Sequence, residues 1–194
     1  MGATLTFRSP VGRLLTVAIG AAGALLVGYA MVTDGPFALW QTGPTALLAL
    51  ALVWSLFWEP QVDVSDGGIT VVNILRTVHV PWPEFTAAET RWSLEIRAGD
   101  LTVTAWAVPA SSGTGTRLAA RRRGRSGNGA SGTGAEAAAL AIGERRAALA
   151  EAGHLRGARR GVLPPQVTWN RAQVAILPTT AALALASWLT TGLL

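Results

Sequence analysis

The segment QVDVSDGGITVVNILRTVHVPWPEFTAAETRWSLEIRAGDLTVTAW, residues 61–106, decides the fold of this chain. Apolar and polar side chains alternate along it, as at Val62 and Val64, with the two-residue period of a half-buried strand. Residues 65–68 and 99–100 are turn signals, and residues 73–76 must hold a further hairpin turn. Short antiparallel strands separated by such turns predict a small all-β sandwich or barrel.

Three uncharged runs flank this segment, at residues 14–33, 37–58 and 172–194. Each is long enough, as a helix, to cross a hydrocarbon core of about 30 Å. The first two are separated only by residues 34–36 and predict a transmembrane helical hairpin. The third predicts a single span. Gly43-Pro44 leaves two alternatives for the second run, a kinked helix or a shorter span over residues 45–58.

Two features of the first run have competing explanations. Gly20, Ala24 and Gly28 recur every four residues and would place small side chains on one helix face, where a neighbouring backbone can approach. In a span rich in Ala and Gly, the same spacing also arises by chance. Residues 28–30 resemble a signal-peptide cleavage site. The second apolar run follows within a few residues, which favours a retained hairpin.

The arginines predict the orientation of these spans. All 16 basic residues of the chain are Arg and the net charge is +5. Three spans place every Arg on the side of the N-terminus and the central region, and leave Asp34 as the charged side chain of the other side. The positive-inside rule makes the arginine side cytoplasmic. The sequence therefore predicts a multi-pass inner-membrane protein with its C-terminus outside.

The region after the strands divides into a loop and a helix. Residues 111–134 contain mainly Gly, Ser, Thr and Arg, which predicts a disordered basic insertion. Residues 133–136 match a capping box, and the Ala-rich run that follows predicts an amphipathic helix ended by Gly153. The predicted organisation is a cytoplasmic tail (1–13), a transmembrane hairpin (14–58), a β domain (59–155), a linker (156–171) and a third transmembrane helix (172–194).

Taken together, the membrane hairpin and the stretches GITVVNILRTVHVPW (68–82), RWSLEIRAGDLTVTAWAVPA (91–110) and EAGHL (151–155) resemble actinobacterial membrane-anchored PH-like proteins. The similar group is the low molecular weight protein antigen 6 type of bacterial PH domain. The resemblance implies a seven-strand PH-like barrel closed by a C-terminal helix, about one strand more than the sequence pattern supplies. It implies no ligand or activity.

The residues give no sign of catalytic, cofactor or metal chemistry. The chain has no Cys, which excludes disulfides and thiol chemistry. His79 and His154 have no metal-ligand spacing, and the carboxylates form no acid–base pair. Trp82, Trp92 and Trp106 are interpreted as packing residues, and Asn73 as a turn residue. We therefore expect a protein that is not an enzyme and takes no cofactor.

Two groups of residues are candidate contacts. The five arginines of the basic insertion could contact anionic lipid, although a solvated charge run is the simpler interpretation: Arg117, Arg121, Arg122, Arg123 and Arg125. Ile74 and Leu75 lie in a predicted hairpin turn, where side chains are normally polar. They would contact the bilayer or a partner, or else pack on the C-terminal helix or belong to a misplaced turn.

The sequence thus favours a membrane-anchored PH-like interaction module that binds a protein partner or anionic lipid. The alternative is an accessory structural subunit of a membrane transport or envelope-synthesis complex, acting through its transmembrane helices. Expected partners are membrane lipids and a membrane protein, including a second copy of the chain. Nucleic acid is not expected, because the basic cluster lacks interleaved aromatic residues for base stacking.

Overall fold

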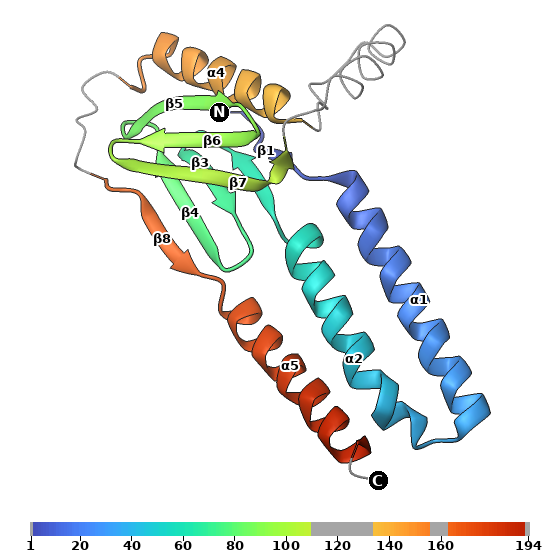
Figure 1. The fold of residues 1–194 in the computed structure, drawn as a ribbon. Helices are drawn as coiled ribbons and strands as arrows, with labels where there is room; N and C mark the ends of the chain where they lie inside the picture. The colour runs from blue at the N-terminus through green and yellow to red at the C-terminus, as the bar shows by residue number, and fades with distance from the viewer. Residues whose placement is uncertain (1, 110–133, 156–162, 193–194) are drawn as a thin grey trace, which may run out of the picture. The chain divides into compact units, whose positions relative to one another are not determined.

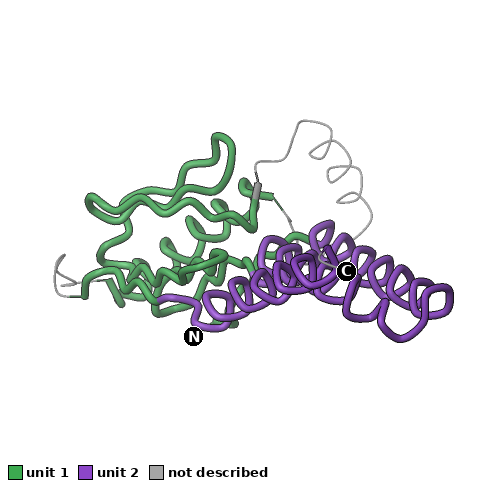
Figure 2. Tube along the Cα trace, turned by 60° about the horizontal axis from the view of Figure 1, so that its bottom comes forward, with its two compact units in different colours: residues 1–9, 60–168 green, residues 10–59, 169–194 purple. Residues whose placement is uncertain are grey.

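The computed structural model describes residues 2–109, 134–155 and 163–192. The chain divides into two compact units, coloured separately in Figure 2. We call unit 1, Met1–Ser9 with Pro60–Thr168, the β module, and unit 2, Pro10–Glu59 with Trp169–Leu194, the helical unit. The fold is α+β, as the sequence predicts: two apolar helices, an antiparallel PH-like β module with its own helix, and a third apolar helix (Figure 1).

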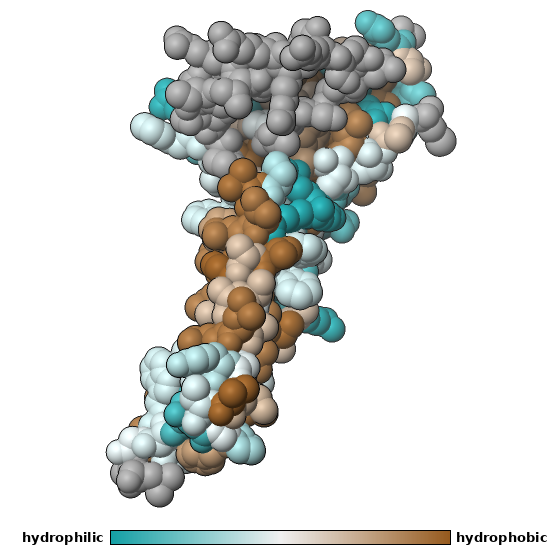
Figure 3. All heavy atoms as spheres, turned by 90° about the vertical axis from the view of Figure 1, so that its right-hand side faces the viewer, coloured by the Kyte–Doolittle hydropathy of each residue, from teal (hydrophilic) through white to brown (hydrophobic). Residues whose placement is uncertain are grey.

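The helical unit contains α1 (Pro10–Asp34), α2 (Ala38–Val53) continued by the π-helix η1 (Trp54–Trp58), and α5 (Arg171–Thr191). All three helices, α2 and η1 taken as one, are long and apolar enough to cross a membrane. Their outer surface is largely apolar in Figure 3, with Leu25 75% and Val32 87% exposed. A water-facing helix would bury such side chains, so this surface suits lipid.

Pro44 lies inside α2, so the second span is continuous and does not start at residue 45. Proline has no N–H to bond the carbonyl of Trp40 one turn earlier. That carbonyl instead accepts a hydrogen bond of 2.5 Å from the hydroxyl of Ser187 on α5, which is fully buried. The proline thereby creates a polar contact between two apolar helices.

The glycines of α1 differ in how closely other helices approach them. A Cβ on Gly12 would lie 2.9 Å from Cβ of Phe57, and one on Gly20 would lie 3.4 Å from Leu50. Glycine at these positions therefore allows close packing with α2 and η1. A Cβ on Gly28 would meet nothing within 4 Å, so Gly28 makes no such close approach within the described chain.

The β module contains eight strands among the described residues. They are β1 (Leu5–Phe7), β2 (Gln61–Val64), β3 (Gly68–Val72), β4 (Arg76–Pro81), β5 (Phe85–Thr90), β6 (Ser93–Ala98), β7 (Leu101–Pro109) and β8 (Gln166–Trp169). One sheet has the order β1-β2-β3-β4-β8 and the other β5-β6-β7. Strands β1 to β7, with helix α4 (Ala135–Glu151), supply the seven strands and closing helix that the resemblance implies.

Three strands are absent from the sequence prediction. Strand β5 lies between β4 and β6, where no strand is predicted. The predicted tail 1–13 contains β1, which pairs with β2, and the predicted linker 156–171 contains β8, which lies beside β4. Both ends of the β module thus come from segments next to the apolar helices.

Alternating side chains of both sheets form the core. Val62, Val64, Ile69 and Val80 from one sheet and Ile96 from the other are fully buried. Helix α4 covers this core with a face of small and branched side chains: Ala135, Ala138, Ala141, Ile142 and Leu149. The helix predicted after the capping box is therefore present and buries one face.

Both ends of α4 have distinct caps. The N-cap is Gly134 without a side-chain hydrogen bond, whereas the predicted cap, Thr133, lies outside the described residues. At the other end Gly153 has φ +79°, and the amides of Gly153 and His154 donate to the carbonyls of Ala150 and Leu149. This pair of bonds is a Schellman motif, as the predicted glycine stop implies.

Candidate interaction surfaces

All connections to the apolar helices leave the five-stranded sheet from one end of its strands. The pairs Phe7↔Val62 and Gln61↔Val72 place the end of β1, the start of β2 and the end of β3 together. The hydroxyl of Thr168, near the end of β8, donates to the carbonyl of Thr77 near the start of β4 (3.4 Å). We call this row of strand ends, together with the turn at residues 73–76, the junction edge.

The connections at the junction edge are short. Two residues separate β1 from α1, two separate η1 from β2, and Asn170 alone separates β8 from α5. Such linkers span about 10 Å at full extension. In the sequence, α1 and α5 therefore begin, and η1 ends, one to three residues from a strand of this sheet.

The turn at residues 73–76 presents a mixed surface. The amide of Asn73 donates to the carbonyl of Arg76 (3.0 Å), which confirms the hairpin turn. Ile74 is half-buried, Leu75 is 44% exposed and Arg76 is exposed. The predicted contact residues thus lie in the predicted turn, and Leu75 is the more exposed of the two.

Asn73 does more than turn the chain, which the sequence did not indicate. Its side-chain amide donates to the carbonyl of Thr104 (2.8 Å), and its side-chain oxygen accepts from the amide of Trp106 (2.9 Å). One side chain thereby joins the first sheet to β7 of the second as a strand neighbour would. It also places Trp106, which is 54% exposed, next to the turn.

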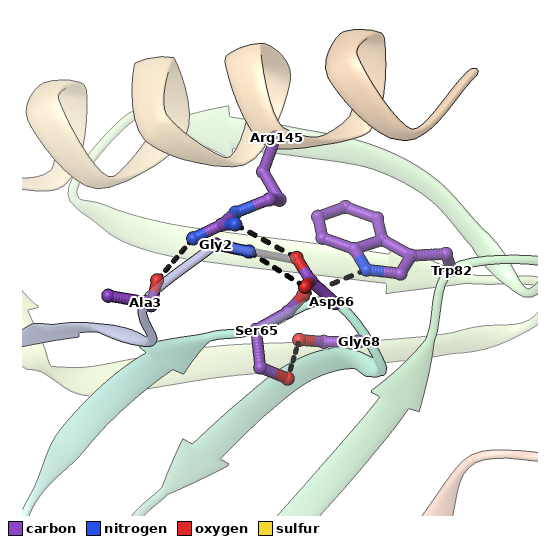
Figure 4. Close-up of polar contacts among 7 residues, drawn as sticks. All are labelled: Gly2, Ala3, Ser65, Asp66, Gly68, Trp82 and Arg145. Carbon is purple, nitrogen blue, oxygen red and sulfur yellow. Dashed lines mark hydrogen bonds and ion pairs between the residues drawn. The ribbon is translucent and has the colours of Figure 1, made fainter. Parts of the chain in front are cut away.

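The opposite end of the first hairpin is held by a polar cluster around Asp66 (Figure 4). Its carboxylate accepts from the amide of Gly2 (3.0 Å) and from the guanidinium of Arg145 on α4 (2.8 Å). Arg145 also donates to the carbonyl of Ala3. The cluster joins the N-terminal segment, the turn at 65–68 and α4. Its role is therefore to stabilise the fold.

The tryptophans of the β module differ in exposure. Trp82 is 3% exposed, packs edge-on against Phe85 and donates to the carbonyl of Ser65 (3.0 Å), as a core residue should. Trp92 is 88% exposed in the turn between β5 and β6, so its interpretation as a packing residue is wrong. A turn of two residues leaves a large side chain no sheet face to cover.

The described residues contain no group of three or more His, Asp or Glu side chains that could hold a metal ion. His79 instead pairs with Thr70 across two strands (Nδ1 to Oγ1, 2.9 Å). The five arginines of the basic insertion, Arg117, Arg121, Arg122, Arg123 and Arg125, lie outside the described residues.

Residues 59–126 match the family model described as Bacterial PH domain. The match covers β2 to β7 of the PH-like module. It supports the bacterial PH-domain part of the resemblance, whereas the actinobacterial low molecular weight protein antigen 6 grouping stays a prediction. No curated protein and no solved structure gives a match to the chain.

Proposed function

We propose that this protein is a non-enzymatic interaction module, anchored in the inner membrane by its three apolar helices and held on the cytoplasmic face. The junction edge carries this proposal. Three short connections to membrane-length helices leave one sheet edge, so the turn at 73–76 is tethered at the membrane surface. A PH-like fold without a catalytic constellation in its described residues suits binding rather than chemistry.

The proposed sidedness follows from charge. All 16 basic residues lie outside the apolar helices or in their first turns, on the β-module side of the chain. At the other end of α1, Asp34 is the last helical residue, and the turn that leads to α2 contains no Arg. This asymmetry favours retention of the β module in the cytoplasm and export of the turn at 34–36 and of the C-terminus.

Anionic lipid is the ligand that the junction edge favours. Leu75 and Trp106 offer apolar and amphipathic side chains of the kind found at membrane interfaces, and Arg76 adds a cation. The arginines of the basic insertion would add attraction to the same leaflet. A membrane protein partner is compatible with this placement.

Single cysteines test the sidedness, because the natural chain has none. Asp34→Cys lies at the last residue of α1, next to the α1–α2 turn, and Asp100→Cys lies in the exposed β6–β7 turn. A membrane-impermeant maleimide should label Asp34→Cys in intact cells and Asp100→Cys only in inside-out vesicles. The reverse pattern would overturn the orientation, and labelling of both from one side would overturn the three-span anchor.

The lipid contact is tested in nanodiscs. We expect an environment-sensitive dye on Leu75→Cys to be quenched by brominated lipids, more strongly when anionic lipid is present. The same dye on Asp100→Cys, four residues before Thr104 on β7, serves as the control. If quenching at Leu75→Cys is no stronger than at the control position, the turn makes no specific contact with lipid.

An accessory structural subunit is the second candidate function. Ala24 and Gly28 are exposed on α1, and no atom of the described chain lies within 4 Å of a Cβ placed on Gly28. This small-residue face would allow a helix of another membrane protein to approach. Gly28→Leu should then reduce co-purification of that protein from crosslinked membranes, whereas Leu25→Ala should not.

A further inference from the structure

A groove runs between strand β5 and helix α4 of the β module. Its volume is about 820 Å³ and its walls belong to one unit. Phe85, Thr86, Ala87 and Ala88 line it from the strand, and α4 lines the other side. Figure 1 shows α4 lying alongside β5.

The strand side of the groove is a sheet edge. β5 is terminal in the order β5-β6-β7, and β6 is its one strand partner among the described residues. Four successive residues of β5 line the groove, although successive side chains point to opposite faces of a sheet. The groove therefore follows the edge of the strand, where backbone donors and acceptors are available for a further strand.

The helix side of the groove is lined mainly by small side chains. Ala139, Gly143, Ala147 and Ala150 follow each other at spacings of one turn. A Cβ on Gly143 would meet nothing within 4 Å. This wall lets another backbone come close, which suits an extended chain rather than a bulky ligand.

Arg146 is the one charged side chain that lines the groove. Its guanidinium lies over the ring of Phe85, 5.2 Å from the ring centre, and forms neither of the two ion pairs among the described residues. A half-buried cation at a sheet edge favours an incoming carboxylate, because a charge-assisted hydrogen bond is stronger than a neutral one.

The charge of the chain itself argues against its own segments as the occupant. Residues 110–133 and 156–162 contain several Arg and no Asp or Glu. Neither complements Arg146. The acidic residues of the chain all lie in or next to the described helices, strands and tight turns, so a second copy offers no free acidic segment.

We propose that this groove binds an extended acidic segment of a partner protein, which adds as a strand to β5 and places a carboxylate on Arg146. The inference rests on the proposed function as an interaction module and names the partner's chemistry. Backbone pairing along β5 would supply affinity, and the cation would select acidic sequences.

The test is a selection of random octapeptides displayed on phage against the full chain in nanodiscs. We expect enriched peptides to carry an acidic residue at one position and β-branched residues around it. Their synthetic versions should bind Gly143→Leu and Arg146→Gln at least about tenfold more weakly. Bound peptide should also protect from hydrogen exchange the β5 amide, at Ala87 or Ala88, that points away from β6.

The variants separate blocking from misfolding. Leucine on Gly143 has open space and a better helix propensity than glycine, so Gly143→Leu should fold. Ala148→Leu, exposed on α4 and outside the groove, is the matched control and should bind peptide like the natural chain.

Three results would overturn the groove proposal. They are enrichment without acidic residues, peptide binding that is unchanged in Gly143→Leu, and quenching of a dye on Gly143→Cys by brominated lipids, which would assign the groove to lipid. The sidedness and Leu75 measurements do not depend on the groove. If the peptide experiment fails and the sidedness and Leu75 measurements give the expected results, the peptide site is rejected and the proposed function is retained.

Discussion

Asn73 is the residue on which the contact between the two sheets most visibly depends. Its side chain makes two hydrogen bonds to the backbone of β7, at Thr104 and Trp106. We expect Asn73→Ala to lower the free energy of unfolding of the β module by about 1–2 kcal/mol, because two partially exposed hydrogen bonds are lost. Hydrogen exchange of β3 and β7, read by mass spectrometry, measures this loss.

Asn73→Asp is the graded control. It keeps an oxygen acceptor for the Trp106 amide and removes the donor to the Thr104 carbonyl. Asn73→Asp should therefore keep the amide of Trp106 protected, whereas Asn73→Ala should free it. Equal protection in all three proteins would mean that the side chain does not join the sheets.

Gly68 is the residue whose backbone no other side chain tolerates. Its φ is +152°, and a Cβ there would lie 2.4 Å from the carbonyl oxygen of Val80 and 3.0 Å from Cα of Pro81. Both neighbours are backbone atoms and cannot rotate away. We expect Gly68→Ala to destabilise the β module by about 2–3 kcal/mol, which hydrogen exchange or a urea titration would measure.

Gly67 provides the comparison for Gly68. Its nearest atom to an added Cβ is the Ser65 hydroxyl at 3.9 Å, an ordinary contact. Gly67→Ala should therefore leave stability nearly unchanged. A similar loss in both variants would show that any residue is disfavoured in this turn and that the close approach at Gly68 is not the cause.

For single residues, the sequence predicted the backbone turn correctly but not the contacts that the side chains make. The turn at 73–76 followed from the strands on either side, which left no other place for it. The bonds of Asn73 to β7 could not be predicted, because they join residues about thirty positions apart and depend on how two sheets approach. The exposure of Trp92 was missed for a related reason, since hydrophobicity alone does not tell a core side chain from one in a turn.

At the scale of elements, two ion pairs offer a matched comparison. Arg145 on α4 bonds Asp66 and Ala3 with its side chain 14% exposed, whereas Arg97 bonds Glu89 with its side chain 48% exposed. Arg145→Gln should lower the stability of the β module by about 2 kcal/mol, because it loses charge-assisted bonds to two segments.

Arg97→Gln should cost less than about 0.5 kcal/mol, as exposed pairs do. Thermal unfolding of both variants in the same detergent gives the difference. Only Arg145→Gln should increase hydrogen exchange in β1, since Arg145 alone reaches the N-terminal segment. Equal costs would contradict the structural role of the Asp66 cluster.

The contact between α2 and α5 gives a second prediction for elements. Ser187→Ala would leave the Trp40 carbonyl, already without its partner at Pro44, unsatisfied in an apolar environment. The expected loss is about 1 kcal/mol, within the range of hydrogen bonds between membrane helices. Steric trapping or reversible unfolding in mixed micelles measures it.

Thr180→Ala is the control for Ser187→Ala. The Thr180 hydroxyl bonds carbonyls of its own helix, at Ile176 and Leu177, which keep their backbone partners. Its removal should have little effect. If Pro44→Ala restored the stability of Ser187→Ala, the carbonyl freed by proline would be identified as the cause.

Element prediction succeeded where periodicity was long and failed where it was short. Strands β2, β3, β4, β6 and β7 each show alternation that matches their burial. Strand β1 has three residues, and β8 is exposed at all four positions, so neither shows a period. Strand β5 reads FTAAET, in which small and polar residues give little contrast. Because β5 was not predicted, the groove beside it could not be predicted either.

For the whole molecule, the positive charge of the basic insertion gives a prediction about attraction to anionic lipid. The five arginines of the basic insertion, replaced together by Gln, should weaken attraction to an anionic leaflet by up to ~1 kcal/mol for each charge. A dye on Ser126→Cys in nanodiscs would report the approach of this segment to lipid. Its quenching should rise with the anionic fraction and fall with salt in the natural background.

The five-Lys variant is the matched control, because it keeps the charge and changes the side chain. It should respond like the natural chain, and the five-Gln variant should not respond to anionic lipid. If all three proteins respond alike, the insertion is a solvated charge run, and the lipid contact would rest on the turn at 73–76 alone.

The two outermost strands of the five-stranded sheet lie far apart along the sequence, β1 at residues 5–7 and β8 at residues 166–169. During synthesis, β1 must therefore wait for some fifty residues of hairpin before β2 emerges from the ribosome. The sheet then lacks its last strand until residues 166–169 have been translated. A nascent chain stopped before residue 166 would expose β4 as a free edge, which another strand could pair with, so the sheet is protected only once this segment has left the ribosome.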